Sequence, residues 1–184
     1  MGWSTHHSTG LIHYAPQHSY RGYTLLVSNS GNIAHLIDME GRICHEWRSD
    51  EGISYGYLLP NGNLLLRTGP AAEETSFLSR PERNLVPGGG RTTSGAILEL
   101  DWDSNVVWEY RYPFLHHDFE RLPNGNTLVL VWKSLPEELA TQVKGGYTDG
   151  SEPGQMLGDA VMEVTAGGEV VDEWRSWEHL SLEE

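Results

Sequence analysis

Three segments of this chain align without a gap: DMEGRICHEWR at 38–48, DWDSNVVWEYR at 101–111 and TAGGEVVDEWR at 165–175. They begin at Asp38, Asp101 and Thr165, so the intervals between them are 63 and 64 residues. A second motif, LPNGN, occurs at 59–63 and again at 122–126, an interval of 63 residues. Two independent motifs that share one period indicate that the chain repeats a single structural unit.

Each motif has the pattern of a β-hairpin. Asn-Gly, Glu-Gly and Gly-Gly turns, whose residues tolerate a positive φ, separate apolar runs such as NLLLR at 63–67 and TLVLVW at 127–132. Two hairpins per period give four short antiparallel strands per unit. Four strands at this spacing are typical of a β-propeller blade, because one such sheet buries both faces only by packing on its neighbours. We therefore predict an all-β fold of about three four-stranded blades.

The register of the motifs sets the predicted organisation. We expect an N-terminal arm at 1–22 and three blades over 23–184, with bounds near 23–52, 53–115 and 116–180. The predicted strands of the first blade, which has no obvious inner strand, are 23–28, 32–38 and 42–48. Those of the second blade are 53–59, 63–68, 95–101 and 105–111, and those of the third are 117–122, 126–132, 159–165 and 169–175. The uncovered edge of the first blade needs a partner.

Two long insertions interrupt the complete blades between their second and third strands, at 69–94 and 133–158. Hairpin loops usually have two to five residues, so we predict that these insertions are functional or interface loops. A short helix is expected at 136–143.

Each outer strand ends on an aromatic residue followed by arginine, at 47–48, 110–111 and 174–175. Large aromatic side chains bury much area on a sheet face, so we expect Trp47, Tyr110 and Trp174 to pack between blades rather than to form a binding platform. The arginines recur with the repeat, which explains them better than an anion site far from the axis would.

Charge and cysteine content argue against several functions. The chain carries 26 acidic and 12 basic side chains, a net charge of −14, and so repels nucleic acid and anionic membranes. Its single cysteine, Cys44, leaves no intrachain disulfide and no Cys-based metal site. No histidine pair has zinc-binding helical spacing, and Asp101-x-Asp103-x-Asn105 lacks the later ligands of a calcium loop, so a hairpin turn is expected there. We predict no cofactor and no metal.

Several segments resemble the bacterial arylsulfotransferase family of β-propellers. They are GYTLL at 22–26, HLIDMEG at 35–41, HHDFERLPNGNTL at 116–128 and DAVMEV at 159–164 followed by GEVVDEW at 168–174. The resemblance covers roughly residues 10–180. It implies a six-bladed ring, of which this chain is the N-terminal half, and a transfer of a sulfuryl group from an aryl sulfate to a phenol through a histidine.

The resemblance carries over only one of the family's axial histidines, to the pair His116 and His117. His117 is favoured because it precedes Asp118, and the structural alternative is a polar channel residue bonded to Asp118 or water. In a regular strand the two side chains would point to opposite faces. The family's nucleophilic histidine lies in later blades and has no counterpart here. We therefore expect His117, with His116, to be an auxiliary that positions or protonates the sulfuryl group or its leaving phenolate.

Two functions remain open. The chain is either an arylsulfotransferase-like half-propeller, completed by further blades, a second copy or a companion chain, or a non-catalytic interaction subunit of a larger assembly. Both readings predict that the chain is not a stable monomer, because open blade faces expose apolar surface. No signal peptide or apolar membrane span is visible, so we expect a soluble chain without membrane insertion. The resemblance suggests the periplasm or the cell exterior, and the cytoplasm stays open.

Overall fold

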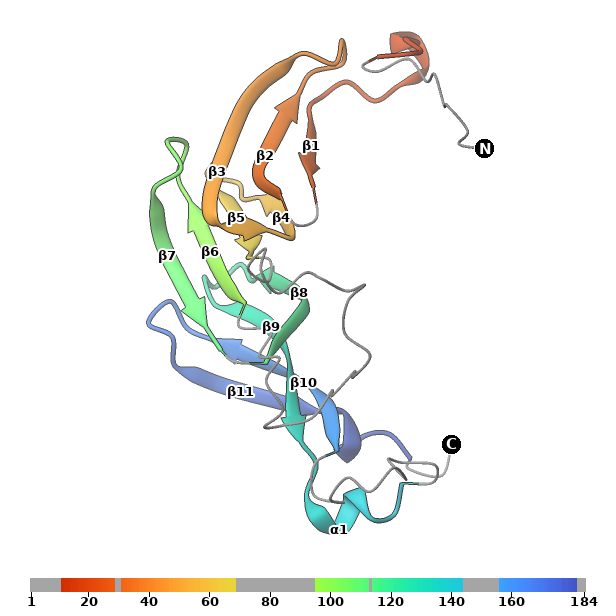
Figure 1. The fold of residues 1–184 in the computed structure, drawn as a ribbon, viewed down its shortest axis with the longest axis vertical. Helices are drawn as coiled ribbons and strands as arrows, with labels where there is room; N and C mark the ends of the chain where they lie inside the picture. The colour runs from red at the N-terminus through yellow and green to blue at the C-terminus, as the bar shows by residue number, and fades with distance from the viewer. Residues whose placement is uncertain (1–10, 29–30, 69–94, 113, 144–155, 182–184) are drawn as a thin grey trace, which may run out of the picture. The chain divides into compact units, whose positions relative to one another are not determined.

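Short runs of apolar residues between turns make strands of most of the described chain. The computed structural model describes residues 11–28, 31–68, 95–112, 114–143 and 156–181 (Figure 1). Within these ranges it contains eleven strands, one short α-helix and two 3₁₀ helices. The strands form three antiparallel sheets, one of three strands and two of four. The predicted all-β fold with blade-like sheets is therefore confirmed.

The first sheet has the order β1-β2-β3. Its strands are β1 (Thr24–Val27), β2 (Gly31–Ile37) and β3 (Ile43–Ile53). Ala34 pairs with Trp47 across β2 and β3, and both side chains are buried together with Leu36. The predicted end of the third strand was wrong, because β3 continues until Ile53 pairs with Gly31 and buries its own side chain.

The second sheet has the order β4-β5-β6-β7. Its strands are β4 (Tyr55–Leu58), β5 (Leu64–Arg67), β6 (Ala96–Leu100) and β7 (Val106–Arg111). Every residue of β6 is buried, and so are the three leucines of β5. A strand covered on both faces is mainly apolar, and Glu99 is the one charged residue of β6, so the two middle strands form the core of this sheet.

The third sheet has the order β11-β10-β9-β8. Its strands are β8 (Leu115–Arg121), β9 (Thr127–Ser134), β10 (Leu157–Val164) and β11 (Val170–Arg175). Val129 and Val131 of β9 alternate with more exposed residues, and Ala160 and Met162 of β10 do the same, so these four side chains line the buried face. The 3₁₀ helix η4 (Ser176–Glu178) follows β11.

The predicted insertions are described only in part. The insertion at 69–94 and residues 1–10 of the arm lie outside the described residues. The described part of the arm contains the 3₁₀ helix η1 (Pro16–His18). The insertion predicted at 133–158 is shorter than expected, because Lys133 and Ser134 extend β9 and pair with Gly158 and Leu157 of β10. The predicted short helix is present as α1 (Glu137–Ala140).

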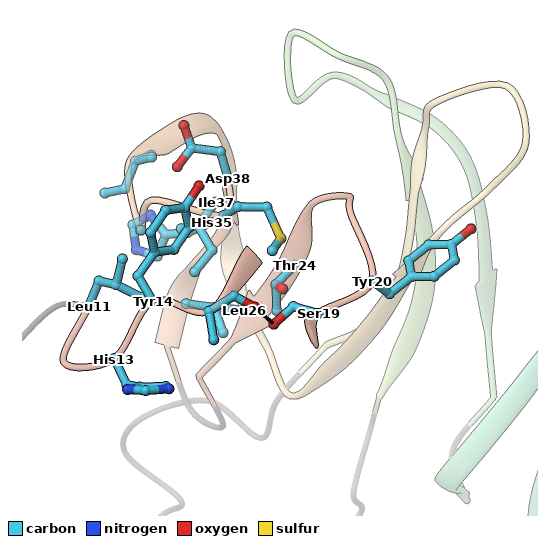
Figure 2. A pocket seen from close by; sticks show the side chains of 14 residues that line it. Leu11, His13, Tyr14, Ser19, Tyr20, Thr24, Leu26, His35, Ile37 and Asp38 are labelled. Carbon is cyan, nitrogen blue, oxygen red and sulfur yellow. Dashed lines mark hydrogen bonds between the residues drawn. The ribbon is translucent and has the colours of Figure 1, made fainter. Parts of the chain in front are cut away.

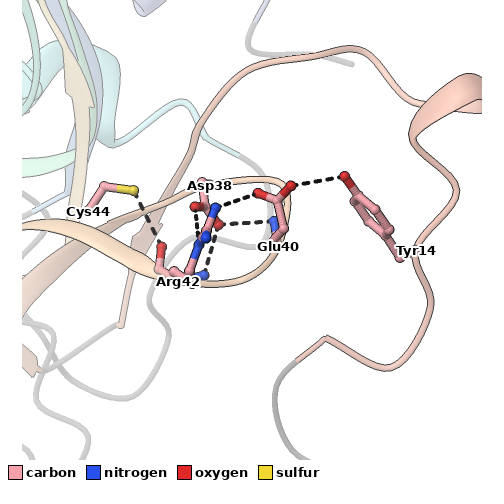
Figure 3. A network of polar contacts seen from close by, with 5 residues as sticks. All are labelled: Tyr14, Asp38, Glu40, Arg42 and Cys44. Carbon is pink, nitrogen blue, oxygen red and sulfur yellow. Dashed lines mark hydrogen bonds and ion pairs between the residues drawn. The ribbon is translucent and has the colours of Figure 1, made fainter.

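The turn between the third and fourth strands of each blade has the same construction in all three sheets. Residues at one repeat position have a positive φ: 77° at Gly41, 68° at Ser104 and 83° at Gly168. The Asp101 carboxylate accepts hydrogen bonds from the backbone N–H groups at 103 and 105, as expected for a hairpin turn. Figure 3 shows the equivalent bonds at Asp38. The alignment of the three motifs in the sequence thus matches the backbone conformation residue by residue at this turn.

The LPNGN motif has a structural role that repeats as well. In the second sheet, the side-chain amides of Asn61 and Asn63 both donate to Glu99 Oε1, at 3.3 and 2.7 Å. In the third sheet, two asparagines donate to one carboxylate oxygen in the same way, from Asn124 and Asn126 to Glu163. We call this arrangement the Asn-Glu clamp. Each clamp joins the hairpin turn to the next strand of its own sheet.

The chain divides into two compact units, residues 1–71 with 98–107, and residues 72–97 with 108–184. The first unit holds the first sheet with the turn between β6 and β7, and the second holds the third sheet. Among the described residues, no helix is long and apolar enough to cross a membrane.

Candidate functional site

The two histidines of the candidate site lie at an irregular point of β8. The register with β9 shifts between Leu115 and Phe119, and His117 has a φ of +51°. A left-handed conformation is uncommon for a residue with a side chain and costs about 1 kcal/mol or more, so it persists only where the surroundings enforce it. Strain of this kind occurs often at functional sites.

Because the strand is irregular here, the two side chains do not point to opposite faces. His116 Nδ1 lies 2.9 Å from His117 Nδ1, and the ring planes are nearly perpendicular. His116 is buried, with 5% of its surface exposed, whereas His117 is exposed. The structure therefore joins the two residues in one pair with a buried and an open member.

Two neighbours hold the buried histidine in place. Its Nε2 lies 3.3 Å from Asp159 Oδ1 on β10. Its ring stacks on the indole of Trp132 on β9, with centroids 4.4 Å apart and planes inclined by 21°. Adjacent strands of one sheet thus supply a carboxylate and a flat apolar surface.

One proton pattern fits this arrangement. When His116 carries its proton on Nε2, next to Asp159, its Nδ1 accepts the hydrogen bond that His117 donates from Nδ1. The Nε2 of His117 is then an acceptor on an exposed ring. The order Asp159, His116, His117 is a relay that runs from a carboxylate through a buried ring to an exposed one.

The sequence indicated the pair but not its carboxylate. Asp118, the expected partner, accepts a hydrogen bond from the backbone N–H of Phe119 at 2.9 Å. Asp159 lies 43 residues after His116 along the chain, and only the pairing of β9 with β10 brings it near. The single signal in the sequence was that DAVMEV, which begins with Asp159, belongs to the same set of segments as HHDF.

Neither a family model nor a curated protein matches this chain. The argument for function therefore rests on the geometry of the pair and on the motifs that surround it.

The first unit contains a separate cavity of about 710 Å³ between the N-terminal arm and the first sheet (Figure 2). Leu11 and Tyr14 of the arm face Leu26 of β1 and His35 and Ile37 of β2. His35 Nδ1 lies 3.0 Å from Glu46 Oε1, so its polar edge is directed to β3. The wall combines these apolar side chains with polar ones, among them His13 and Asp38, so the cavity has a mixed lining.

The remaining candidate residues have local partners. Each outer-strand arginine pairs with the glutamate two residues earlier, as Arg48 Nη2 does with Glu46 at 3.1 Å and Arg111 Nη2 with Glu109 at 2.9 Å. Arg175 does the same with Glu173 at 2.6 Å. In the part of the chain that the structure describes, no group of three or more His, Cys, Asp or Glu side chains could hold a metal ion.

Proposed function

We propose that this chain provides the acid-base histidine pair of an aryl sulfuryl-transfer site, in a propeller that further blades or a second chain complete. The observation that carries the proposal is the relay from Asp159 through His116 to an exposed His117 held in a left-handed conformation. The substrate class comes from the resemblance of the motifs at 116–128 and 159–174 to arylsulfotransferases.

In the proposed reaction His117 is the catalytic residue. The S–O bond to the aryl oxygen of the donor breaks, and the protonated Nε2 of His117 gives its proton to the leaving phenolate. A new S–O bond forms to the acceptor phenol, whose proton returns to the same nitrogen. A bond from sulfur to a nucleophile forms in the first step and breaks in the second, and this nucleophile belongs to the completing part of the ring.

His116 and Asp159 are positioning residues in this scheme. They orient the ring of His117 and fix its tautomer, but they do not touch the substrate. Loss of the carboxylate removes the group that orients the buried ring, so the Asp159→Asn variant should lower kcat more than it changes KM.

The test is the transfer from p-nitrophenyl sulfate to phenol, followed by release of p-nitrophenol. His117→Gln should lower kcat by about 100-fold, as expected for loss of a general acid-base group. His18→Gln, at an exposed histidine of η1, is the matched control and should retain the rate. An active protein that keeps its rate in His117→Gln would contradict the proposal.

A second function is favoured by a different observation. Trp174 on β11 is 42% exposed, although the aromatic residues at its repeat position in the other sheets are buried. Such a residue suits an interaction subunit whose open sheet face binds another chain. An assembled protein that shows no sulfuryl transfer with any aryl donor would support this second function over the first.

A further inference from the structure

The aromatic residues at one repeat position of the outer strands are covered to different extents. Trp47 on β3 is 0% exposed, Tyr110 on β7 is 8% exposed and Trp174 on β11 is 42% exposed. What covers the first two residues shows what would cover the third.

The turn between β6 and β7 covers Trp47. Trp47 Nε1 donates to the backbone carbonyl of Asp101 at 3.0 Å, and the Trp102 indole lies edge-on at 5.3 Å. Trp102 also stacks on His45, with centroids 3.7 Å apart. The backbone N–H of Arg48 donates to Ser104 Oγ in the same turn. An outer strand thus packs on the third-to-fourth-strand turn of the next sheet.

The turn between β10 and β11 has the same role for β7. Trp108 Nε1 donates to the carbonyl of Ala166 at 2.9 Å. A Cβ atom added to Gly168 would lie 4.0 Å from Tyr110 Cδ2, so this aromatic ring lies over the left-handed residue of the turn. The same kind of contact therefore occurs twice, once in each compact unit.

The first sheet has the same turn, at residues 38–42, with no outer strand of a preceding sheet against it among the described residues. Asp38 organises this turn as Asp101 organises its equivalent (Figure 3). Met39 occupies the repeat position of Trp102, and Glu40, Gly41 and Arg42 are exposed. In the described ranges, β11 is thus an outer strand without a turn on it, with only the His179 ring stacked on Trp174, and the turn at 38–42 has no outer strand on it.

We propose that these two surfaces bind each other between two copies of the chain: Trp174 of one copy packs on the turn at 38–42 of a second copy. The Met39 thioether then lies where Trp102 lies against Trp47, and thioethers make favourable contacts with aromatic rings. In such a head-to-tail pair, one copy still has a free Trp174 and the other still has a free turn at 38–42. The contact therefore either closes into a ring or continues into a longer chain of copies.

The N-terminal arm limits this association. A Cβ atom added to Gly41 would lie 3.4 Å from Leu11 Cβ, so the arm lies over the left-handed residue as Tyr110 lies over Gly168. Tyr14 donates its hydroxyl to Glu40 Oε1 at 3.0 Å, which fastens the arm to the turn (Figure 3). Tyr14→Phe should therefore strengthen the association.

The test is sedimentation velocity over a concentration series, without substrate, so that its outcome is independent of sulfuryl transfer. The unmodified chain should associate at micromolar concentration. Trp174→Ala and Met39→Asp should each raise the dissociation constant by about tenfold or more, as expected at an interface hot spot. Val171→Ala is the matched control and should leave association unchanged. Val171 is exposed on the same strand, but three residues before Trp174, so its side chain points to the opposite face of the sheet.

Mixing the two variants makes the test specific for a head-to-tail contact. The Met39→Asp copy keeps Trp174 and the Trp174→Ala copy keeps the turn, so one contact remains and the mixture should associate when neither variant does so alone. Restored association also shows that both variants are folded. A monomeric unmodified chain, variants that associate normally, or a mixture that stays monomeric would each overturn the proposal.

Discussion

The left-handed conformation of His117 gives a test that separates backbone strain from the loss of the ring. His117→Gly and His117→Ala both remove the imidazole, but only Ala keeps the Cβ atom that makes a positive φ unfavourable. We expect the Gly variant to be more stable than the Ala variant by about 1 kcal/mol, measured by urea unfolding. In a regular strand glycine would be the less stable of the two.

A lower stability of the Gly variant would therefore contradict the left-handed backbone at 117. The same pair bears on function, because both variants lack the basic nitrogen and should lose transfer activity equally.

Asp101 should make the stability of the chain depend on pH. Its side-chain hydrogen bond from Asn105 and the backbone N–H groups of the turn lower the pKa of its carboxyl. A pKa lower in the folded state stabilises the fold above the unfolded pKa, about 3.9, and the effect disappears as the pH falls through the folded value.

The difference in Tm between the unmodified chain and Asp101→Asn should thus be largest near neutral pH and shrink below about pH 4, in thermal unfolding followed by circular dichroism. Asp103→Asn, at an exposed carboxylate of the same turn, is the control. A Tm difference that is constant over this pH range would show that hydrogen bonding by the ionised Asp101 does not contribute to the stability of the fold.

At the scale of the element, the Asn-Glu clamp explains why LPNGN recurs with its blade. Glu99 is 8% exposed and accepts amide hydrogen bonds from the turn, so removal of a donor weakens the support of a nearly buried carboxylate. Asn63→Ala should lower the free energy of unfolding by about 2 kcal/mol, since hydrogen bonds to charged groups contribute about 1.5–3 kcal/mol.

A double-mutant cycle of Asn63→Ala with Glu99→Gln should show coupling between the two positions. Asn32→Ala, at an exposed position of β2, should change stability by less than about 0.5 kcal/mol. Additive effects of the Asn63 and Glu99 substitutions would mean that the clamp is not a stabilising unit.

Periodicity predicted the elements well because the repeated features are local. Turn residues, alternating apolar positions and the LPNGN motif each act within a few residues, and the strands lie within a few residues of their expected bounds. The end of β3 was missed because it depends on Ile53 being buried and paired with Gly31. No local sequence pattern predicts that Ile53 pairs with Gly31.

The candidate site was predictable only in outline, for the same reason. The motif at 116–128 identified the two histidines, but their mutual hydrogen bond requires the bulge in β8 and the left-handed backbone at 117. Asp159 enters the site through the pairing of β9 with β10. Neither the bulge nor the approach of a distant strand follows from spacing along the chain.

At the scale of the whole molecule, transfer activity should depend on assembly. Because the nucleophile of the proposed reaction lies in the completing part of the ring, this chain alone should show no transfer at any protein concentration, even where sedimentation shows that it associates. Transfer should appear when a companion chain that supplies the later blades is added, and it should rise with the concentration of that companion. Transfer by this chain alone would show that the site works without the later blades.

The Asn-Glu clamps also bear on how such a chain can arise. Each clamp draws its donors and its acceptor from a single sheet, so a gene segment that encodes one sheet carries the partners of its own buried carboxylate. Tandem duplication of that segment therefore adds a new blade without creating an unsatisfied polar group in the old one. Subsequent divergence is then free to act on the residues between blades, while the hairpin and its glutamate must change together.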